Sequence, residues 1–190
     1  MLLSTHQAKL KICLLLVLLI FTNSSSASEP SQFSGIVKYH NDVRSKFQQH
    51  PLTWSNSLAS YAQEWVDRLA ATQSCQMLHR PNYAGEYDSE KYLQIHGENL
   101  FWASAEYTNG TEKLQILSPK EIVAAWAEEE DYYDYQSNTC QEGQDCGHFT
   151  QMVWHESRQV GCAKAICGDK SQIWACNYHP RGNYIGEHPY

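Results

Sequence analysis

The chain lacks long apolar runs and has few basic residues, the features that favour membrane insertion and nucleic-acid binding. Beyond the first 27 residues, no apolar run approaches the roughly 20 residues that a membrane-spanning helix needs. Basic residues are scarce, with 14 Lys and Arg against 21 Asp and Glu and a net charge of −7. Because this surplus of negative charge repels phosphates, nucleic acid and anionic membrane surfaces are disfavoured as partners. A lipid ligand would have to be buried in a cleft.

Several catalytic motifs are also missing. His155-Glu156 is not followed by a second histidine, because Gln159 stands at that position, so the helix motif of zinc proteases fails. The chain has no Gly-x-Ser-x-Gly elbow. Residues 96–98 (His-Gly-Glu) resemble part of a zinc deaminase motif, but the required Cys-x-x-Cys pair is absent. A metal-assisted hydrolase stays open as an alternative, since two histidines, an acid and a water are sufficient parts.

The N-terminus has the pattern of a secretory signal peptide. Lys9 and Lys11 precede an apolar run over residues 12–21, and a stretch of small polar residues follows. Ser25 and Ala27 fit the cleavage site, so cleavage is predicted after Ala27. The mature chain is then a single domain, residues 28–190, secreted to the outside of the cell or to the periplasm of a bacterium. Removing two lysines and no acidic residue gives it a net charge of −9.

Cysteine usage fits an oxidising compartment. Cys13 leaves with the signal peptide, and six cysteines remain in the mature chain: Cys75, Cys140, Cys146, Cys162, Cys167 and Cys176. An even number in a secreted chain predicts three disulfides, for which 15 connectivities exist. Spacing alone proposes only the pair Cys140 with Cys146, which closes a small loop.

Two amphipathic helices are predicted in the first half of the mature chain. The first has its apolar face at Ile36, His40, Val43 and Phe47, and Pro51 is expected to end it. His40 on that face is interpreted as a packed core histidine. The second helix follows a cap at Ser55 and carries the stripe Leu58, Tyr61, Ala62, Trp65 and Leu69. It leads to Cys75, which would join it to the late cysteines.

A third helix has a strong start signal and an acidic end. Ser118 and Glu121 form a capping box, with a proline at the first helical position. Ile122 and Trp126 mark the buried face, and Glu129 falls on the same side. Periodicity does not separate Glu129 from Glu130, because both flank the apolar stripe. Glu129 therefore needs a partner or a raised pKa.

Residues 147–157 place one histidine before an unusually apolar run. Phe149, Met152, Val153 and Trp154 are expected to anchor this segment in the core, each side chain contributing roughly 1.5–3 kcal/mol if fully buried. His148 would then be held at the edge of the core, either as a structural histidine or as a preorganised ligand.

The remaining elements are loops and strands. Residues 80–96 are expected to form an exposed loop, residues 98–103 a short strand, and the chain up to Leu117 another loop, which carries a glycosylation sequon at Asn109. Residues 160–166 and 172–178 alternate like strands and predict a hairpin. Helices early and a hairpin late predict an α+β fold in layers.

Several motifs together resemble the CAP superfamily of cysteine-rich secretory, antigen 5 and plant pathogenesis-related class one proteins. They are residues 147–157 and 173–184, with further matches at His40-Asn41 and Arg44, residues 52–54, Leu58-Ala59 and residues 97–100. The resemblance covers about residues 34–190. It implies a three-layer α-β-α sandwich with a central antiparallel sheet, stabilised by the disulfides Cys75–Cys167, Cys140–Cys146 and Cys162–Cys176.

The resemblance also implies a cleft with two histidines and two glutamates. The matching positions are His79, Glu98, Glu129 and His148. His96 is the alternative to His79, because it lies closer to Glu98 in the sequence, whereas His79 follows Cys75 at the family's spacing. Imidazole nitrogens bind zinc directly, and carboxylates orient a bound water. The cleft is therefore expected to accept zinc or another divalent cation, with no cofactor required.

The function implied by the resemblance is that of a non-enzymatic, defence-type effector that binds a sterol or another small lipid. The metal-assisted hydrolase is one alternative. Another is the precursor of a signalling peptide, because residues 180–190 resemble a peptide that plant members release, with the cut between His179 and Pro180. The structural alternative for this tail is that Tyr184 and Ile185 pack on the core.

Overall fold

The computed structural model describes residues 27–72, 75–80 and 96–190. The predicted signal segment up to residue 26 and residues 81–95 of the predicted loop lie outside this part of the chain. No helix within the described ranges is both long and apolar enough to cross a bilayer.

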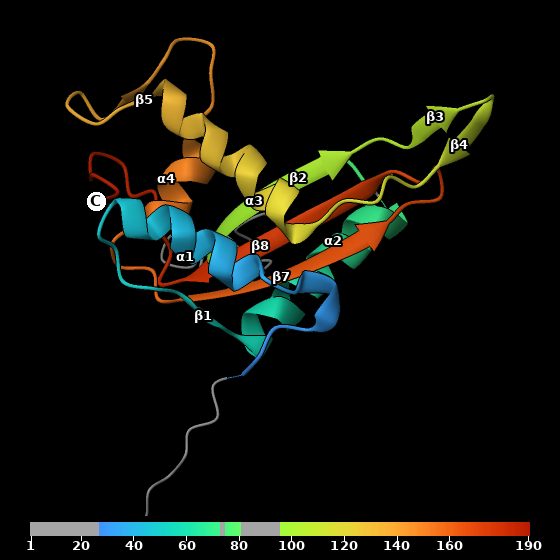
Figure 1. Ribbon diagram of the computed structural model, residues 1–190, viewed down its shortest axis with the longest axis horizontal. Helices are drawn as coiled ribbons and strands as arrows, with labels where there is room; N and C mark the ends of the chain where they lie inside the picture. Colours follow the sequence, from blue (N-terminus) through green and yellow to red (C-terminus); the bar gives the residue numbers. More distant parts are fainter. Residues whose placement is uncertain (1–26, 73–74, 81–95) are drawn as a thin grey trace, which may run out of the picture.

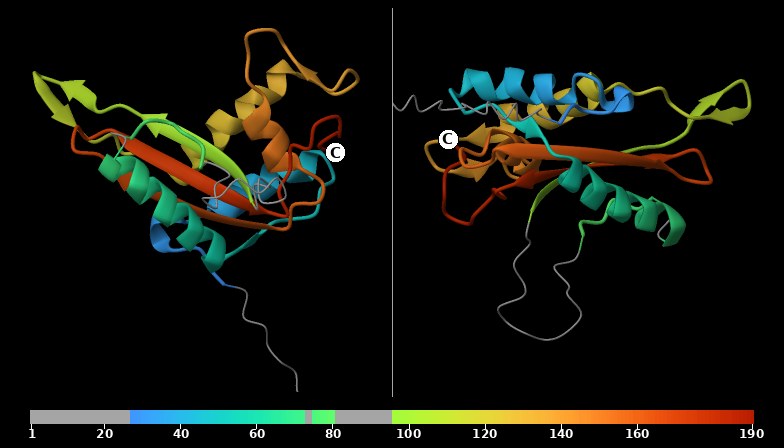
Figure 2. Two further views of the ribbon diagram at one scale, coloured as in Figure 1. Left: turned by 180° about the vertical axis from the view of Figure 1, so that it is seen from behind. Right: turned by 90° about the horizontal axis from the view of Figure 1, so that it is seen from below.

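The described elements form three layers (Figure 1). Helices α1 (Ile36–Lys46), α3 (Pro119–Ala127) and α4 (Gly147–Val153) cover one face of a four-stranded sheet. Helix α2 (Asn56–Thr72) packs on the opposite face, against the two central strands. The view from below separates α1 and α3 from α2, with the sheet between them (Figure 2). The predicted α-β-α sandwich is confirmed.

The sheet is antiparallel apart from one edge. Its order is β1 (Thr53–Trp54), β7 (Gln159–Ile166), β8 (Gln172–His179) and β2 (Gly97–Ala103). Strand β8 pairs antiparallel with both β7 and β2, while the short β1 pairs parallel with β7. The predicted hairpin and the predicted strand after residue 97 are confirmed to within one residue at each end.

The larger core lies between the sheet and helices α1, α3 and α4. Its buried members are Phe33, Ile36, Val43, Leu52, Trp54, Ile122, Val123, Trp126, Phe149, Met152, Val153, Val160, Cys162, Trp174, Cys176 and Tyr178. Trp154 is also buried, at 1% exposure. The apolar run after His148 therefore anchors α4, as the sequence predicted.

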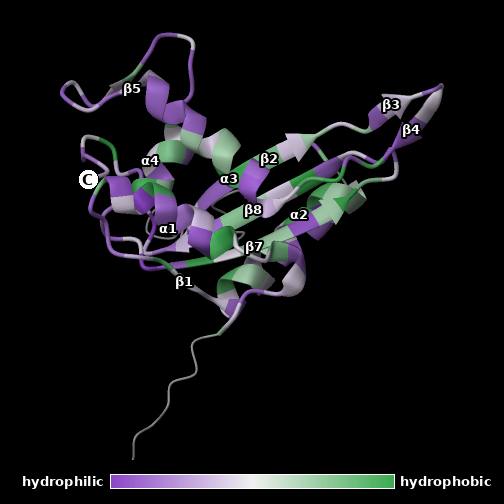
Figure 3. Cartoon of the chain, in the orientation of Figure 1, coloured by the Kyte–Doolittle hydropathy of each residue, from purple (hydrophilic) through white to green (hydrophobic). Residues whose placement is uncertain are grey.

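The smaller core lies between the sheet and α2. Its buried members are Ala62, Trp65, Val66, Leu69, Cys75, Leu100, Ala163, Cys167, Ile173 and Ala175. Gly161 allows α2 to approach β7, because a Cβ atom there would lie 2.2 Å from the backbone nitrogen of Ala59. Colouring by hydropathy shows apolar residues along the central strands and α2, and mostly hydrophilic residues around β5 (Figure 3).

Local capping explains where the helices begin. The predicted capping box is present, since Glu121 N donates to Ser118 Oγ at 3.4 Å and Ser118 N donates to Glu121 Oε2 at 2.7 Å. Ser55 caps α2 through its hydroxyl oxygen, as predicted. The cap of α1 was not foreseen: Glu29 accepts a hydrogen bond from Val37 N at 3.0 Å. Its carboxylate thus lies at the positive end of the α1 dipole.

The first helix ends earlier than predicted. It stops at Lys46, with Phe47 as its C-cap and Gln48 in the left-handed region at φ 56°. Pro51 lies beyond this turn and does not end the helix. Phe47 nevertheless keeps its place in the core, because its ring packs edge-on against Phe149 at a centroid distance of 5.4 Å.

The segment predicted as a loop up to Leu117 contains a hairpin instead. Strands β3 (Glu106–Thr108) and β4 (Thr111–Lys113) pair antiparallel around Asn109 and Gly110. Both turn residues have positive φ, at 51° and 74°, which is the geometry of a type I′ turn. The Asn-Gly pair was the sequence signal for this hairpin.

The remaining elements are short. They are η1 (Ser31–Phe33), η2 (Glu128–Tyr132) and the paired strands β5 (Tyr133–Asp134) and β6 (Thr139–Cys140).

All six cysteines in the described part of the chain are paired. The disulfides are Cys75–Cys167, Cys140–Cys146 and Cys162–Cys176, as the resemblance implied. Cys162 and Cys176 are directly opposite each other on β7 and β8. The disulfides fit an extracellular location.

The C-terminal tail packs on the protein, but not through the pair that was expected. Ile185 is fully exposed, so this part of the prediction was wrong. Tyr184 is half-buried near Trp154, with ring centroids 5.9 Å apart. The main anchor is Tyr190, whose ring lies 4.5 Å from that of Phe47.

Candidate functional site

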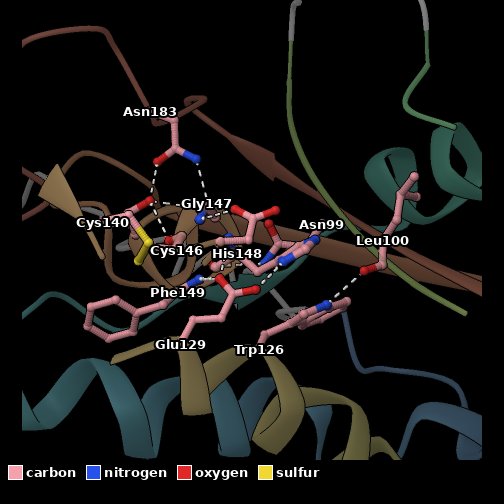
Figure 4. Close-up of polar contacts among 12 residues, drawn as sticks. Asn99, Leu100, Trp126, Glu129, Cys140, Cys146, Gly147, His148, Phe149 and Asn183 are labelled. Carbon is pink, nitrogen blue, oxygen red and sulfur yellow. Dashed lines mark hydrogen bonds and ion pairs between the residues drawn. A yellow bond between two sulfur atoms is a disulfide. The ribbon is translucent and has the colours of Figure 1, made fainter. Parts of the chain in front are cut away.

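Glu129 and His148 form the first of two histidine–glutamate pairs (Figure 4). Glu129 Oε1 accepts from His148 Nδ1 at 2.5 Å, and Glu129 Oε2 accepts from the backbone N–H groups of His148 at 2.9 Å and Phe149 at 3.1 Å. Helix α4 has no side-chain cap at Cys146. Asp145 Oδ1 accepts from the first helical N–H, that of Gly147, at 2.9 Å, and Glu129 satisfies the next two. One carboxylate therefore fixes both the helix start and the His148 ring.

The backbone brings Glu129 to this position by a turn that the sequence did not predict. The α-helix ends at Ala127, and Glu129 belongs to the 3₁₀ turn η2. Glu128 is exposed, as expected. Helical periodicity did not separate Glu129 from Glu130. The structure shows that Glu129, the residue implied by the family resemblance, is the one that contacts His148.

His79 and Glu98 form the second pair. His79 Nδ1 donates to Glu98 Oε1 at 2.8 Å, and the backbone N–H of Arg80 donates to the same oxygen at 3.0 Å. The Glu98 side chain is fully buried, whereas that of His79 is 60% exposed. The hydrogen bond to Glu98 raises the pKa of His79 above its usual value of 6.5. His96 lies elsewhere, with its ring against those of Tyr61 and His179.

Both pairs border one polar cleft of about 220 Å³. Its lining residues are His79, Gly97, Glu98, Asp145, Gly147, His148, Gln151, Arg181, Gly182 and Asn183. Three of the four predicted site residues line it, and Glu129 holds His148 from behind. No site role was predicted for Asp145, Gln151 or the tail residues 181–183, because their only signal in the sequence is that they lie in or beside matching motifs.

The donor set resembles a two-histidine cation site. Each ring has its Nδ1 engaged by a carboxylate, which leaves Nε2 of His79 and His148 as the nitrogens available to a cation. Within residues 27–72, 75–80 and 96–190, no group of three or more His, Cys, Asp or Glu side chains is close enough to hold one metal ion. The two imidazoles can supply two ligands of a cation whose remaining ligands are waters, and the described residues do not form a structural zinc cage.

A buried hydrogen-bond network supports α4 from the sheet side. Asn99 Nδ2 donates to His148 O at 3.0 Å and to the Tyr178 hydroxyl at 3.2 Å. The Tyr178 hydroxyl lies 2.8 Å from His40 Nε2, and His40 Nδ1 lies 2.8 Å from Ile36 O. Because Ile36 O can only accept, Nδ1 carries the proton and Nε2 accepts from Tyr178. Burial lowers the pKa of His40 to about 4, which keeps it neutral, as its predicted core role requires.

Arg44 fixes the other end of α4. Its buried guanidinium donates to the carbonyl oxygens of Met152, Trp154 and Ser157 at 2.7–3.0 Å, and its Nε donates to His50 O at 2.8 Å. Burial lowers the pKa of Arg44 to about 10. The helix that carries His148 is therefore held at both ends by side chains from other elements.

A second hollow has the opposite character. An open groove of about 370 Å³ runs between α1 and α3, and most of its lining surface is apolar. The residues along it are Tyr39, Asp42, Val43, Lys46, Lys120, Val123, Ala124, Ala127 and Glu128. The polar cleft and the apolar groove share no residue, so they are separate sites.

Known proteins resemble this chain over nearly its whole length. Residues 37–178 match the model of the cysteine-rich secretory protein (CAP) family. The chain is 38% identical over 176 residues to pathogenesis-related protein 1B of Nicotiana tabacum, covering 93% of this chain and 90% of that protein. Venom allergen-like protein 4 of Schistosoma mansoni has a similar fold, with a TM-score of 0.58 and 24% identity over 85% of this chain and 95% of that one. NaASP2, whose crystal structure was determined with Zn²⁺, has a TM-score of 0.58 and 18% identity over 88% of each chain.

Proposed function

The chain belongs to the cysteine-rich secretory protein (CAP) family, and from this premise we propose that it is a secreted, non-enzymatic protein that binds a small lipid. Its similarity to pathogenesis-related relatives makes it a defence-type member, and members of this family are in general not classical enzymes. The observation that carries the proposal is the apolar groove between α1 and α3. A divalent cation at the polar cleft is the second candidate.

The groove suits a sterol or a fatty acid better than the polar cleft does. Tyr39, Ala124 and Ala127 offer apolar surface, and transfer of lipid area onto them is favourable by about 25 cal/mol per Å². The sequence does not distinguish a lipid site from the His/Glu cleft. The polar lining of that cleft argues against an apolar ligand there.

Lipid binding is expected to be nearly independent of salt, because it depends on burial of apolar area. Binding of a fluorescent sterol should change by less than about twofold between about 50 mM and about 500 mM NaCl. Ala124→Trp fills the groove from an exposed helical position and should abolish binding. Ala71→Trp on α2 is the matched control, since Ala71 is also an exposed helical alanine. Equal binding by both variants, or binding that collapses with salt, would contradict the proposal.

Cation binding at the cleft is supported by the two imidazoles and their carboxylate partners. When bound, a divalent ion would supply positive charge between His79 and His148, while Glu98 and Glu129 hold the two rings in place. NaASP2, with a similar fold, was crystallised with Zn²⁺.

Zinc affinity is expected to weaken below about pH 6, because protons then compete for the imidazoles. The raised pKa of His79 makes this competition begin at a higher pH for that ring. In calorimetry, His79→Ala and His148→Ala should each weaken zinc binding, whereas His96→Ala should not. Loss of zinc only in His96→Ala would show that the wrong histidine was assigned to the cleft.

We also propose that the protein catalyses no reaction in its cleft. Every cysteine among the described residues is in a disulfide, so this part of the chain offers no free thiol as a nucleophile. The hydrolase alternative requires ester or peptide cleavage by the zinc-loaded protein that disappears in His148→Ala. Such a result would replace the binding function with a catalytic one.

A further inference from the structure

The tail contributes directly to the wall of the polar cleft. Residues Arg181, Gly182 and Asn183, here called the strap, line it together with His79 and His148. The strap leaves the end of β8 and passes along α4, far in sequence from the other lining residues.

Asn183 spans the first turn of α4 with both ends of its amide (Figure 4). Its Nδ2 donates to Gly147 O at 2.8 Å, and its Oδ1 accepts from Thr150 Oγ1 at 2.8 Å. Gly147 immediately precedes His148, and Thr150 follows it by two residues. The amide therefore clamps the backbone on both sides of the histidine.

A buried hydrogen bond, a close backbone contact and a left-handed residue keep the strap in this position. Gly182 N donates to the buried Gln151 Oε1 at 2.9 Å. A Cβ atom on Gly182 would lie 2.5 Å from Trp154 Cγ, so only glycine fits against that ring. Asn183 has φ 58°, a left-handed conformation that asparagine and glycine tolerate better than other residues.

We propose that the strap is a component of the cation site, in which Asn183 is a positioning residue for His148. Cation binding in the cleft and detachment of the strap then exclude each other. The inference rests on the proposed cation site. Because coupling between two equilibria is reciprocal, an ion that needs the strap in place must also hold the strap in place.

This coupling has a consequence for the signalling-peptide alternative. A cut between His179 and Pro180 would release Asn183 with the peptide and remove the clamp on α4. A bound cation would slow that release. The two activities would then belong to two successive states of one chain, the intact protein and the cleaved one.

The sharpest variant is Asn183→Gly. Glycine accepts the left-handed backbone without strain, so the substitution removes the two side-chain hydrogen bonds and little else. Asn138→Gly is the matched control. Asn138 is also left-handed, at φ 52°, and its amide accepts from the Tyr133 hydroxyl and donates to Glu187 O of the tail. The substitution Asn138→Gly therefore removes a hydrogen bond to the tail at Glu187, which lies outside the cleft.

Zinc calorimetry on these folded variants tests the positioning. We expect Asn183→Gly to weaken zinc binding by about tenfold or more, as loss of a residue that orients a metal ligand typically does, and Asn138→Gly to leave it within about twofold. Thr150→Val, which removes the donor to Asn183 Oδ1, should weaken zinc binding as well. Thr150→Ser keeps the hydroxyl and should restore it.

Hydrogen exchange of the tail amides tests the reciprocal effect. Saturating zinc should slow exchange of Gly182 N–H in the wild-type protein, and this protection should be smaller in Asn183→Gly. Equal zinc affinity in the wild type and Asn183→Gly, or zinc binding without any protection of the strap, would overturn the coupling alone. Absence of zinc binding to the wild type would overturn the cation site and the coupling with it.

Discussion

At the scale of single residues, buried polar groups hold the elements around the site in place. His40 is fully buried and neutral, with both ring nitrogens hydrogen-bonded. Arg44 is fully buried and donates to four carbonyl oxygens rather than to a carboxylate. Such groups are costly unless every donor has a partner, so they specify one arrangement of α1 against α4.

The pKa of His40 predicts how stability changes with pH. Its pKa falls from 6.5 in the unfolded chain to about 4 in the folded one, chiefly through burial. Above pH 6.5 the histidine is neutral in both states and its contribution is complete. Between pH 6.5 and 4 the unfolded chain takes up a proton that the folded chain refuses, so stability falls as pH falls, by about 3 kcal/mol in total from this residue.

Urea denaturation at several pH values checks this expectation. His40→Gln should flatten the pH dependence between pH 7 and 4, although it lowers stability at pH 7. Part of the slope should remain, because burial also lowers the pKa of His96. His79 acts in the opposite direction: its raised pKa gives stability that is present at low pH and lost as pH rises through the folded value. An unchanged slope in His40→Gln would show that another group causes the acid sensitivity.

At the scale of elements, the C-terminal tail behaves as part of the domain. Tyr190 packs on Phe47 and stacks on Tyr135 at a centroid distance of 4.7 Å, and His155 N donates to Pro189 O at 2.7 Å. These contacts join the tail to α1, to the turn after β5 and to the segment after α4. The tail therefore covers apolar surface that would otherwise face water.

Two tail substitutions separate a packed tail from a loose one. Tyr190→Ala should lower the free energy of unfolding by about 1–3 kcal/mol, since it removes a half-buried aromatic ring from a cluster of rings. Ile185→Ala should change it by less than about 0.5 kcal/mol, because Ile185 is fully exposed. Both values come from thermal or urea unfolding. If the two variants proved equally stable, the tail would not contribute to the fold.

At the scale of the whole molecule, the disulfides constrain very different lengths of chain. Cys75–Cys167 joins residues 92 positions apart and links the end of α2 to the turn after β7. Cys140–Cys146 closes a loop of six positions. In the chain-entropy account, the longer loop loses more freedom in the unfolded state.

Removing these two bridges should therefore cost unequal amounts. Replacing Cys75 and Cys167 by alanine should destabilise the protein by about 4.5 kcal/mol, and replacing Cys140 and Cys146 by about 2 kcal/mol. Guanidinium unfolding of each double variant measures the difference. A larger loss from the short loop would indicate that native contacts around α4, rather than chain entropy, determine its contribution.

The sequence alone determined the features that depend on neighbouring residues. The capping box at Ser118, the cap at Ser55 and the apolar stripe of α2 are local patterns, and each helix begins where they predicted. The hairpin of β7 and β8 was also readable, because its two strands are joined by a short turn. The Asn109-Gly110 turn signal was equally local, but the pair was interpreted only as part of a glycosylation sequon within a loop.

Only the tertiary structure decided which side chains meet. Glu98 reaches His79 and Glu129 reaches His148 across 19 positions each, and Asn183 reaches Gly147 across 36. No periodicity fixes such contacts, because they follow from how three layers pack and from where 3₁₀ turns and strand ends point the chain. The same packing separated a polar cleft from an apolar groove, a division that the sequence, read residue by residue, did not contain.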